Sequence, residues 1–348
     1  MIKVGIAGVG FMGWMHYLAY KRVADVQLSA ICSRSDAKRA GDWRGIQGNF
    51  GPPGEQIDVS GIQGYRSLDE LLADPSIDLV DLCLPPHVHA EASIAALRAG
   101  KHVFCEKPMA LTPEECDAMM AASKETGKLL FVGQVLPMFP EYSQTLKWIR
   151  EGTYGAVTGG TFRRVISDPT WLEDFYEADR VGGPLVDLHI HDAHLIRLVF
   201  GMPTAVMSQG RMRGDVVEYC HTLFQFDQND FVVHAESGVI RQQGRPFTHG
   251  FHMQLEQATV LFEFAVLGGE AELIQPLTVL TEDGEMIRAE LPQGDEVTPF
   301  VLEIEEVARS IKSGTVSDIL GGTLARDALV LCHCQTDSVR QGALIATS

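Results

Sequence analysis

The sequence predicts two domains of different fold class: a doubly wound parallel α/β domain over residues 1–127 and an α+β domain over residues 128–348. The chain opens with a short apolar run that leads directly into closely spaced glycines. Apolar runs of strand length then alternate with helical patterns as far as residue 134. Beyond residue 157 the runs become short, frequent and hairpin-like. This second pattern predicts a mostly antiparallel sheet with helices on one face and the other face open.

The glycines near the start of the chain indicate a dinucleotide-binding Rossmann domain. Gly8, Gly10 and Gly13 have the spacing G-x-G-x-x-G, between a strand at residues 4–7 and a helix expected over residues 11–21. In such a motif the three glycines allow a tight turn, close approach to a pyrophosphate and close packing of the helix on the strand. The amide groups from Phe11 and Met12 onward would face the phosphates. The alternative is a purely structural turn, in a chain with 34 glycines.

Composition narrows the classes of partner. A net charge of −18 argues against nucleic acid, and no apolar run reaches the length that spans a membrane. The seven cysteines lack C-x-x-C spacing, which favours reduced thiols in a cytoplasmic protein. Cys332-His333-Cys334 could suggest a metal, but on a helix these side chains point in different directions, so we expect no metal there.

The end of the second strand, expected over residues 27–32, bears on the choice of cofactor. An NAD site usually carries Asp or Glu about twenty residues after the glycines, where it binds the adenosine ribose. This chain has Ser33 and Arg34 there. A hydroxyl and a guanidinium suit a 2′-phosphate better than a carboxylate would. NADP is therefore slightly favoured over NAD, the alternative being that Arg34 is a solvated loop residue.

Caps and chain breakers define the other elements of the first domain. Residues 41–64, rich in Gly, Gln and Pro, are expected to form an inserted loop. Ser67 can cap a short helix to Leu72, and Gly100 ends a helix that begins at His89. Strands are expected over residues 77–84, 101–105 and 129–134.

The second domain is expected to be built from hairpins. Alternating patterns predict strands over residues 158–166, 217–227, 231–240, 251–255, 259–265 and 277–281. A helix is expected over residues 141–151, and a closing helix over residues 323–341 would pack back near the first domain.

Several motifs together resemble the glucose–fructose oxidoreductase / inositol dehydrogenase / MocA family of NAD(P)-dependent oxidoreductases. They are the glycine motif, Pro85-Pro86-His87-Val88-His89, the run from Ala99 to Glu106-Lys107-Pro108, and Asp187-Leu188-His189-Ile190-His191, which is similar to the family's D-x-x-x-H element. The Glu-Lys-Pro ending is the most specific of these. The resemblance covers nearly the whole chain and implies a substrate domain whose open sheet pairs with a second subunit, in a homodimer or homotetramer.

The resemblance also implies site residues. Lys107 corresponds to the catalytic lysine of the family, and Leu84, Pro85, His89 and Glu106 belong to the cofactor-binding set. Lys107 follows the carboxyl end of a strand, where open α/β sheets bind their ligands. The alternative for Lys107 is an ordinary surface lysine in a turn.

The second half of the candidate site lies in a helix-like segment. Asp187 and His191 are four residues apart, so a helix would place both on one face. We expect His191 to act as the general base near neutral pH and Asp187 to orient substrate hydroxyls, the alternative being a buried structural pair. Further substrate contacts are expected from Trp171, Tyr176, Arg180 and His194.

The sequence departs from the family pattern at two of these positions. His194 stands where the family usually has an acidic residue, and Pro137 stands where members often have arginine. His189 and His194 near His191 could form a zinc site, but the family is generally metal-free, so no metal is expected.

The sequence therefore predicts an NAD(P)-dependent oxidoreductase that acts on a secondary alcohol of a sugar, cyclitol or related polyol. Two alternatives stay open: a redox-neutral, NAD-dependent glycosidase of the same family, and a non-catalytic dinucleotide-binding regulator.

Overall fold

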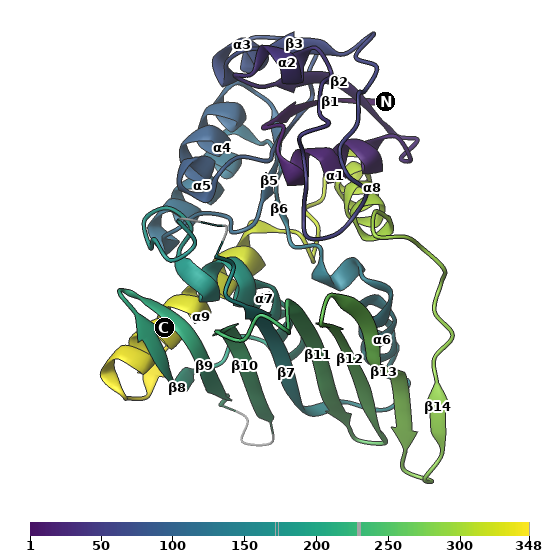
Figure 1. Cartoon of the computed structure of the whole chain (residues 1–348), viewed down its shortest axis with the longest axis vertical. Coiled ribbons are helices and arrows are strands. Elements are labelled where there is room, and N and C mark those ends of the chain that lie inside the picture. Colours follow the sequence, from purple (N-terminus) through teal and green to yellow (C-terminus); the bar gives the residue numbers. More distant parts are fainter. Residues whose placement is uncertain (171, 173, 228–230, 348) are drawn as a thin grey trace. The chain divides into compact units, whose positions relative to one another are not determined.

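A computed structural model of the chain describes every residue except 171, 173, 228–230 and 348 (Figure 1). It contains two compact units. Unit 1 comprises Met1–Met138 and Gln293–Arg326, and unit 2 comprises Phe139–Pro292 and Asp327–Ser348. Unit 1 thus continues beyond the expected boundary at residue 127 and includes a segment from the last fifth of the chain.

The sheet of unit 1 has six parallel strands in the order β3-β2-β1-β4-β5-β6. This is the strand order of dinucleotide-binding doubly wound sheets, so the predicted fold class of the first domain is confirmed. The strands are β1 Ile2–Ala7, β2 Val26–Cys32, β3 Gln63–Tyr65, β4 Leu79–Leu82, β5 His102–Glu106 and β6 Leu130–Gly133. β1, β4 and β5 are almost completely buried, as strands covered on both faces should be.

Helices surround this sheet. They are α1 Phe11–Tyr20, α2 Asp36–Arg39, α3 Leu68–Leu72, η1 Pro86–Val88, α4 His89–Arg98, α5 Pro113–Thr126, η2 Leu136–Met138 and α8 Thr298–Ser313. The expected cap of α3 is present, because the Ser67 hydroxyl accepts the Glu70 N–H and the Glu70 carboxylate accepts the Ser67 N–H. α8 was not expected from the sequence. Its apolar side, with Phe300, Ile304 and Val307, is buried in the core that also contains α1.

The inserted segment between α2 and β3 packs onto the start of α1. The Trp14 indole N–H donates to the Pro52 carbonyl over 2.8 Å. The Phe50 ring lies edge-on to Phe11, with centroids 4.9 Å apart, and Trp43 is completely buried. Aromatic burial therefore holds this loop against the glycine motif.

The sheet of unit 2 has nine strands in the order β14-β13-β12-β11-β7-β10-β9-β8-β15. The strands are β7 Val157–Ser167, β8 Ala205–Arg213, β9 Val216–Gln225, β10 Val232–Ile240, β11 Phe247–Leu255, β12 Ala258–Leu267, β13 Glu270–Thr281, β14 Met286–Arg288 and β15 Ile345–Ala346. Within the described strands, β7 and β10 pair in parallel and the other pairs are antiparallel. The predicted mostly antiparallel sheet is confirmed. β8, β14 and β15 are additions that the sequence pattern did not reveal.

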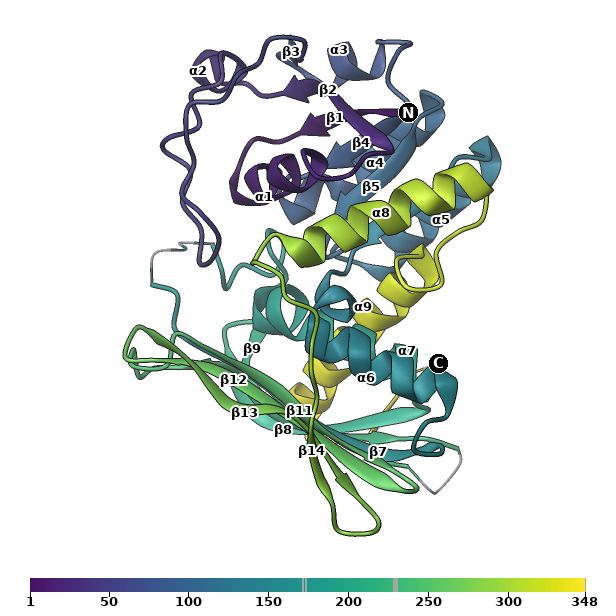
Figure 2. The same cartoon turned by 90° about the vertical axis from the view of Figure 1, so that its right-hand side faces the viewer.

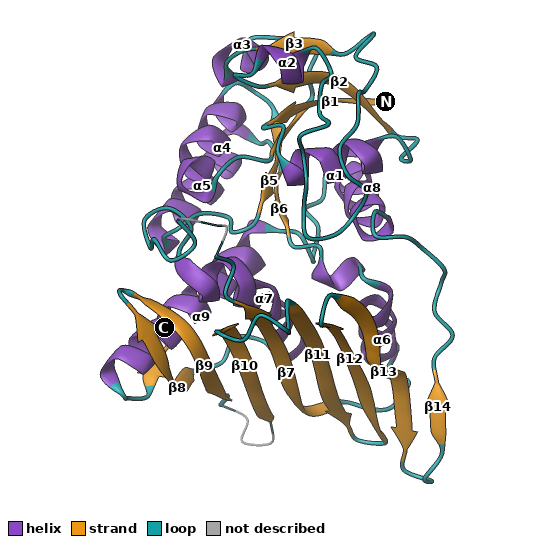
Figure 3. Cartoon of the chain, viewed as in Figure 1, coloured by secondary structure: helices purple, strands orange, loops and turns teal. Residues whose placement is uncertain are grey.

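The helices of unit 2 lie along one face of this sheet, as Figures 2 and 3 show. They are α6 Pro140–Glu151, a π-helical turn at Leu185–His189, α7 Ile190–Phe200 and α9 Gly322–Gln341, whose first five residues belong to unit 1. The seven cysteines are free thiols, as expected. None of the helices in the described part of the chain combines the length and apolar character needed to cross a bilayer.

Candidate active site

The three glycines after β1 differ in the room that the surrounding backbone leaves for a side chain. Gly8 has φ +101°, and a Cβ there would lie 2.2 Å from the Cys83 carbonyl oxygen. A Cβ on Gly13 would lie 2.2 Å from the Gly8 carbonyl oxygen. A Cβ on Gly10 would meet no atom within 4 Å. The loop is therefore tight at both ends and open at Gly10, where a pyrophosphate would approach.

The N-terminus of α1 suits an anion. Gly10 is the N-cap and offers no side-chain cap, and the first turn carries no acidic residue. The first amide groups of a helix need partners from outside the helix, and phosphate oxygens can provide them. Phe11 and Met12 are half-buried at this position, so both predicted cofactor residues lie at the loop. These features fit a dinucleotide.

Cations gather at the carboxyl end of β2. Arg34 is exposed and Ser33 is half-buried. Lys38, which the sequence analysis did not single out, donates to the Val9 carbonyl over 2.5 Å, and Arg39 bonds the Ser33 carbonyl. Lys38 is one turn beyond Arg34 in a cap-and-helix pattern, which is the signal that could have revealed it.

The His89 side chain contacts the loop that follows β4. Its ring is completely buried, with Nδ1 2.7 Å from the Pro108 carbonyl and Nε2 2.7 Å from the Leu84 carbonyl. Leu84 is half-buried and Pro85 is exposed. His89 therefore connects the loop that carries Leu84 and Pro85 to the segment that follows Lys107.

Lys107 lies immediately after β5. It is partly exposed, whereas every other residue from 103 to 110 is buried. The Lys107–Pro108 peptide bond is cis. The Lys107 N–H donates to Glu106 Oε2 over 3.1 Å, so the carboxylate next to it in sequence fixes its backbone. Lys107 is thus the polar side chain that this segment presents at its surface.

Asp187 and His191 stand out in the same way. From residue 185 to residue 196, these two are partly exposed and all the others are buried. Asp187 lies in the π-helical turn and His191 in the first turn of α7, rather than both in one regular α-helix. Single π-turns inserted in helices occur frequently at functional sites. Asp187 and His191 are therefore the two residues of this otherwise buried segment that keep some solvent access.

Buried ionic and polar contacts hold the segment from residue 185 to residue 196 against the sheet of unit 2. Arg164 of β7 makes two hydrogen bonds to Asp192 of α7, with Nε–Oδ2 at 2.6 Å and Nη2–Oδ1 at 3.1 Å. His189 Nε2 lies 3.0 Å from Gln335 Nε2, and Gln335 also donates to Thr222 over 2.8 Å. Burial lowers the pKa of His189 to about 4. His189 is therefore neutral near pH 7 and belongs to the buried polar contacts of unit 2.

The other predicted substrate residues have diverse surroundings. Tyr176 donates its hydroxyl to Asp168 over 2.9 Å and stacks under the Arg213 guanidinium, 3.7 Å from the ring centroid. Arg180 lies 3.5 Å from Asp174 at the surface. His194 is completely buried, so it faces the interior rather than solvent. Trp171 lies outside the described residues.

Among the described residues, His16, Asp81 and Cys83 form the one group of three potential metal ligands, within 4.8 Å of one another. The histidines around His191 form no such group within the described part of the chain. Sequence analysis missed the first cluster. Its signal was Asp81, a carboxylate in the middle of an apolar strand, because aspartate is almost never fully buried without a partner.

Comparisons with known proteins identify the family of both parts of the chain. A family model described as "Oxidoreductase family, NAD-binding Rossmann fold" matches residues 2–134, and one described as "GFO/IDH/MocA C-terminal domain" matches residues 142–261. A 1,5-anhydro-D-fructose reductase from Ensifer adhaerens is 30% identical over 201 residues, which cover 51% of this chain and 60% of the reductase. An inositol 2-dehydrogenase from Rhizobium meliloti (strain 1021) is 26% identical over 346 residues, which cover 94% of this chain and 96% of that protein.

The extent of these matches differs between relatives. In curated relatives that match at 29–35% identity, the chain spans between 41% and 66% of the relative's length. A solved structure of levoglucosan dehydrogenase in complex with NADH and L-sorbose aligns with a TM-score of 0.80 at 20% identity, over 100% of this chain and 99% of that one. The two proteins therefore share a fold from end to end.

Proposed function

Because the chain belongs to the GFO/IDH/MocA family of oxidoreductases with an NAD(P)-binding Rossmann domain, we propose that it transfers a hydride between a nicotinamide cofactor and a secondary alcohol of a sugar, cyclitol or related polyol. One observation carries the proposal. Lys107, Asp187 and His191 are the partly exposed side chains of segments that are otherwise buried. An acid–base side chain that keeps solvent access in an otherwise buried segment can come within hydrogen-bond reach of a substrate.

Each residue has a role in this reaction. When bound, the nicotinamide ring accepts or returns the hydride. In the oxidation direction, His191 takes the proton of the substrate hydroxyl, while the hydride leaves the carbon that carries this hydroxyl. Lys107 donates a hydrogen bond to that hydroxyl oxygen, and the Asp187 carboxylate orients neighbouring hydroxyls. In the reduction direction, His191 returns the proton to the carbonyl oxygen.

The relatives support an alcohol or sugar substrate. The named proteins above are a reductase of anhydrofructose, an inositol dehydrogenase and a levoglucosan dehydrogenase. All three names describe oxidoreductases, which favours net redox chemistry over the redox-neutral glycosidase and the non-catalytic regulator.

The decisive experiment follows nicotinamide absorbance with purified protein, NAD⁺ or NADP⁺ and a panel of sugars, inositols, anhydrosugars and glycosides. Growth of the reduced-cofactor signal with a polyol supports the proposal. Release of free sugar from a glycoside without net reduction would replace it with the glycosidase. Cofactor binding without turnover on any member of the panel would point to the regulator.

The cations after β2 favour NADP as the preferred cofactor. Arg34 is exposed, so alanine at this position should not disturb the fold. We expect R34A to weaken NADP⁺ binding by about tenfold to a hundredfold, because a charge-assisted hydrogen bond contributes roughly 1.5–3 kcal/mol. NAD⁺ binding should change little. Fluorescence titration with both cofactors measures the ratio, and R288A, an exposed arginine of β14, is the matched control. An unchanged ratio in R34A would remove Arg34 from cofactor selection.

The bare face of the nine-stranded sheet supports a homo-oligomer. No described element of unit 2 covers this face in Figure 2. Cross-strand register places six of its side chains in one row: Met207, Leu223, His234, Thr161, His252 and Leu261. In the next row Gly250 has no side chain, and Arg163 reaches across it to Glu263 at 3.3 Å while bonding Glu236 at 2.7 Å. A face with exposed apolar groups and charges of both signs can pair with a second copy of itself.

An exposed leucine of β9 on this face provides the test. Leu223 is 56% exposed in the single chain. We expect L223D to convert the assembly to monomers, because two copies would bury unpaired carboxylates at the two-fold contact. Light scattering coupled to size exclusion measures the mass, with L344D, an equally exposed leucine near the C-terminus, as control. A wild-type mass of one chain would refute the interface.

A further inference from the structure

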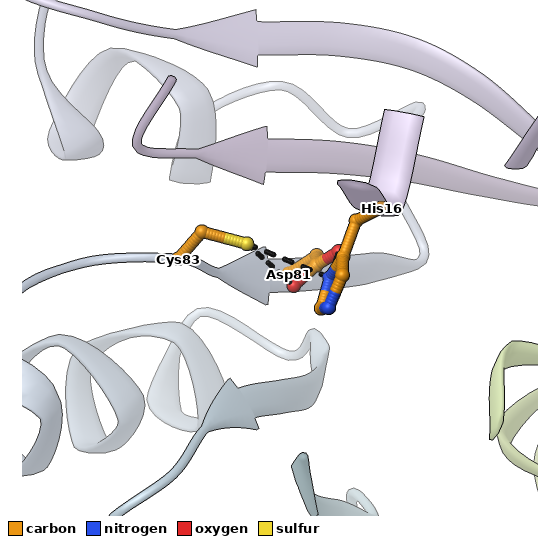
Figure 4. Close-up of side chains that lie close together, drawn as sticks. All are labelled: His16, Asp81 and Cys83. Atoms are coloured by element: carbon orange, nitrogen blue, oxygen red, sulfur yellow. Dashed lines mark hydrogen bonds and ion pairs between the residues drawn. The ribbon is translucent and has the colours of Figure 1, made fainter. Parts of the chain in front are cut away.

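A buried cluster of ionisable side chains lies beneath the Glu106–Lys107 segment, entirely within unit 1. Figure 4 shows the His16 imidazole, on α1, directed at Asp81 on β4 and at Cys83 just after it. His16 Nδ1 lies 2.8 Å from Asp81 Oδ2, and the Cys83 sulfur lies 3.5 Å from His16 Nδ1. The ring also stacks on Phe104 of β5, with centroids 5.2 Å apart. His16 and Asp81 are both completely buried.

The second nitrogen of the same ring faces another carboxylate. His16 Nε2 lies 3.0 Å from Glu106 Oε1, at ion-pair distance though without hydrogen-bond alignment. The other oxygen of Glu106 accepts the Lys107 N–H. A Cβ on Gly133 would lie 3.0 Å from Glu106 Oε1, so the neighbouring strand leaves just enough room for this carboxylate. His16 is thus linked through Glu106 to the backbone of Lys107.

The number of protons on the His16 ring determines the charge of the ionic bridge that His16 forms between Asp81 and Glu106. A neutral imidazole has one N–H, but both ring nitrogens here face carboxylate oxygens. Asp81 accepts a further hydrogen bond from the Tyr20 hydroxyl at 2.9 Å, and Glu106 accepts the Lys107 N–H, so both carboxylates act as acceptors. A neutral ring could donate to only one of these two carboxylates, whereas an imidazolium presents an N–H to both of them.

The surroundings agree with an imidazolium. Burial alone lowers the pKa of His16, but the charge and the hydrogen bond of Asp81 act against burial, and that pKa lies well above its ordinary value. Glu303 of α8 is completely buried nearby, and neither of its carboxyl oxygens has a hydrogen-bond partner. Burial, followed by the charge of Glu106, raises the pKa of Glu303 well above its ordinary range, so Glu303 is neutral. Tyr20 and Cys83 are also neutral, because burial raises the pKa of each.

We propose that His16 is a positioning residue that, as a buried imidazolium shared between Asp81 and Glu106, fixes the Glu106 carboxylate beneath Lys107 and offsets its negative charge. The inference rests on the proposed function, because Lys107 is the group whose placement it governs. His16 touches no substrate itself. Loss of its charge leaves two buried carboxylates, and a third potential one in Glu303, without a compensating cation. Carboxylates in that state take up protons at higher pH.

Loss of the His16 charge should change the pH dependence of the reaction in one direction. With His16 present, its positive charge lies between the Asp81 and Glu106 side chains and offsets their negative charge. In H16Q, we expect the uncompensated pair to take up a proton more readily, which makes Glu106 a weaker acceptor for the Lys107 N–H. The acidic limb of the kcat/KM profile for polyol oxidation should therefore move to higher pH, by about one pH unit or more. In H16Q/D81N, which removes one of the two carboxylates, that limb should move back toward the wild-type position.

The first experiment observes the bridge without requiring turnover. In ¹⁵N NMR of the wild-type holoprotein at pH 7.5, both ring nitrogens of His16 should give protonated signals, identified by their loss in H16Q. A neutral imidazole overturns the proposal whatever the enzyme's activity. This measurement uses the wild-type chain, so it stands even where H16Q fails to fold.

The second experiment measures the pH profiles of wild type, H16Q, H16Q/D81N and H102Q. His102 lies at the opposite end of the same strand as Glu106 and serves as the matched control. A shifted acidic limb in H16Q alone, recovered in the double variant, supports the positioning role. A wild-type profile in a folded, cofactor-binding H16Q overturns it. Inactive wild-type protein with a doubly protonated His16 would refute the proposed function, and with it the role toward Lys107, while confirming the ionic bridge.

Discussion

Replacing Lys107 with methionine is expected to lower kcat/KM for polyol oxidation by about 10²–10⁴-fold while cofactor binding persists. Methionine keeps the unbranched apolar part of the side chain and removes the ammonium group, so the loss reports the hydrogen bond and charge supplied to the reacting hydroxyl. The backbone of residue 107 would still donate to Glu106, because that bond uses the main-chain N–H. The local structure should therefore survive the change.

Steady-state kinetics and NAD(P)H titration together measure these two quantities. H191Q should show a loss of similar size, because it removes the base that accepts the substrate proton. The control is K124M, which changes a surface lysine in the last turn of α5. K101M would not be suitable, because Lys101 is buried and donates to two carbonyls. Wild-type turnover in K107M or H191Q would refute the assigned roles.

Replacing Arg164 with methionine is expected to destabilise unit 2 by about 3–5 kcal/mol, because it leaves the Asp192 carboxylate buried without its cation. Arg164 is 4% exposed and Asp192 is 1% exposed, so water cannot take the place of the lost hydrogen bonds. The ion pair attaches α7, which carries His191, to β7. Loss of the pair should therefore reduce activity as well as stability.

Urea unfolding followed by circular dichroism measures the free-energy change at a fixed protein concentration. R340M is the matched control, because Arg340 pairs with Asp337 at the surface, where such pairs contribute about 0–1 kcal/mol. The double variant R164M/D192L should recover much of the loss, since an apolar pair leaves no buried charge. Equal effects in R164M and R340M would contradict the buried bridge.

Local signals in the sequence were sufficient for the nucleotide-binding unit. The glycine spacing, the strand before it and the position of Lys107 after another strand each describe a contiguous segment, and the structure has all of them. The capping box at Ser67 and Glu70 was similarly local. Such features depend on neighbouring residues, so a single chain carries enough information to predict them.

The features that the sequence did not predict depend on residues far apart in the chain. The contacts of Asp81 with His16 and of His16 with Glu106 join three segments, and an apolar strand pattern gives no register for them. α8 belongs to unit 1 although 154 residues, Phe139–Pro292, separate the two parts of that unit. The π-turn at Asp187 is a matter of backbone hydrogen bonding that no residue type specifies. NADP preference, substrate and oligomeric state remain predictions.

The interrupted path of unit 1 has a consequence during synthesis on the ribosome. Its first part emerges early, but the apolar face of α8 that completes its core is made only after unit 2 has been translated. At ~5–20 residues per second, the intervening 154 residues take roughly 8–30 s. For that interval the nascent nucleotide-binding unit exposes the side of α1 that α8 will cover. We therefore expect folding of this chain to depend on chaperones that bind the incomplete N-terminal unit. Because unit 1 is built from two separate stretches of sequence, cutting the gene at a single point should not yield two intact units.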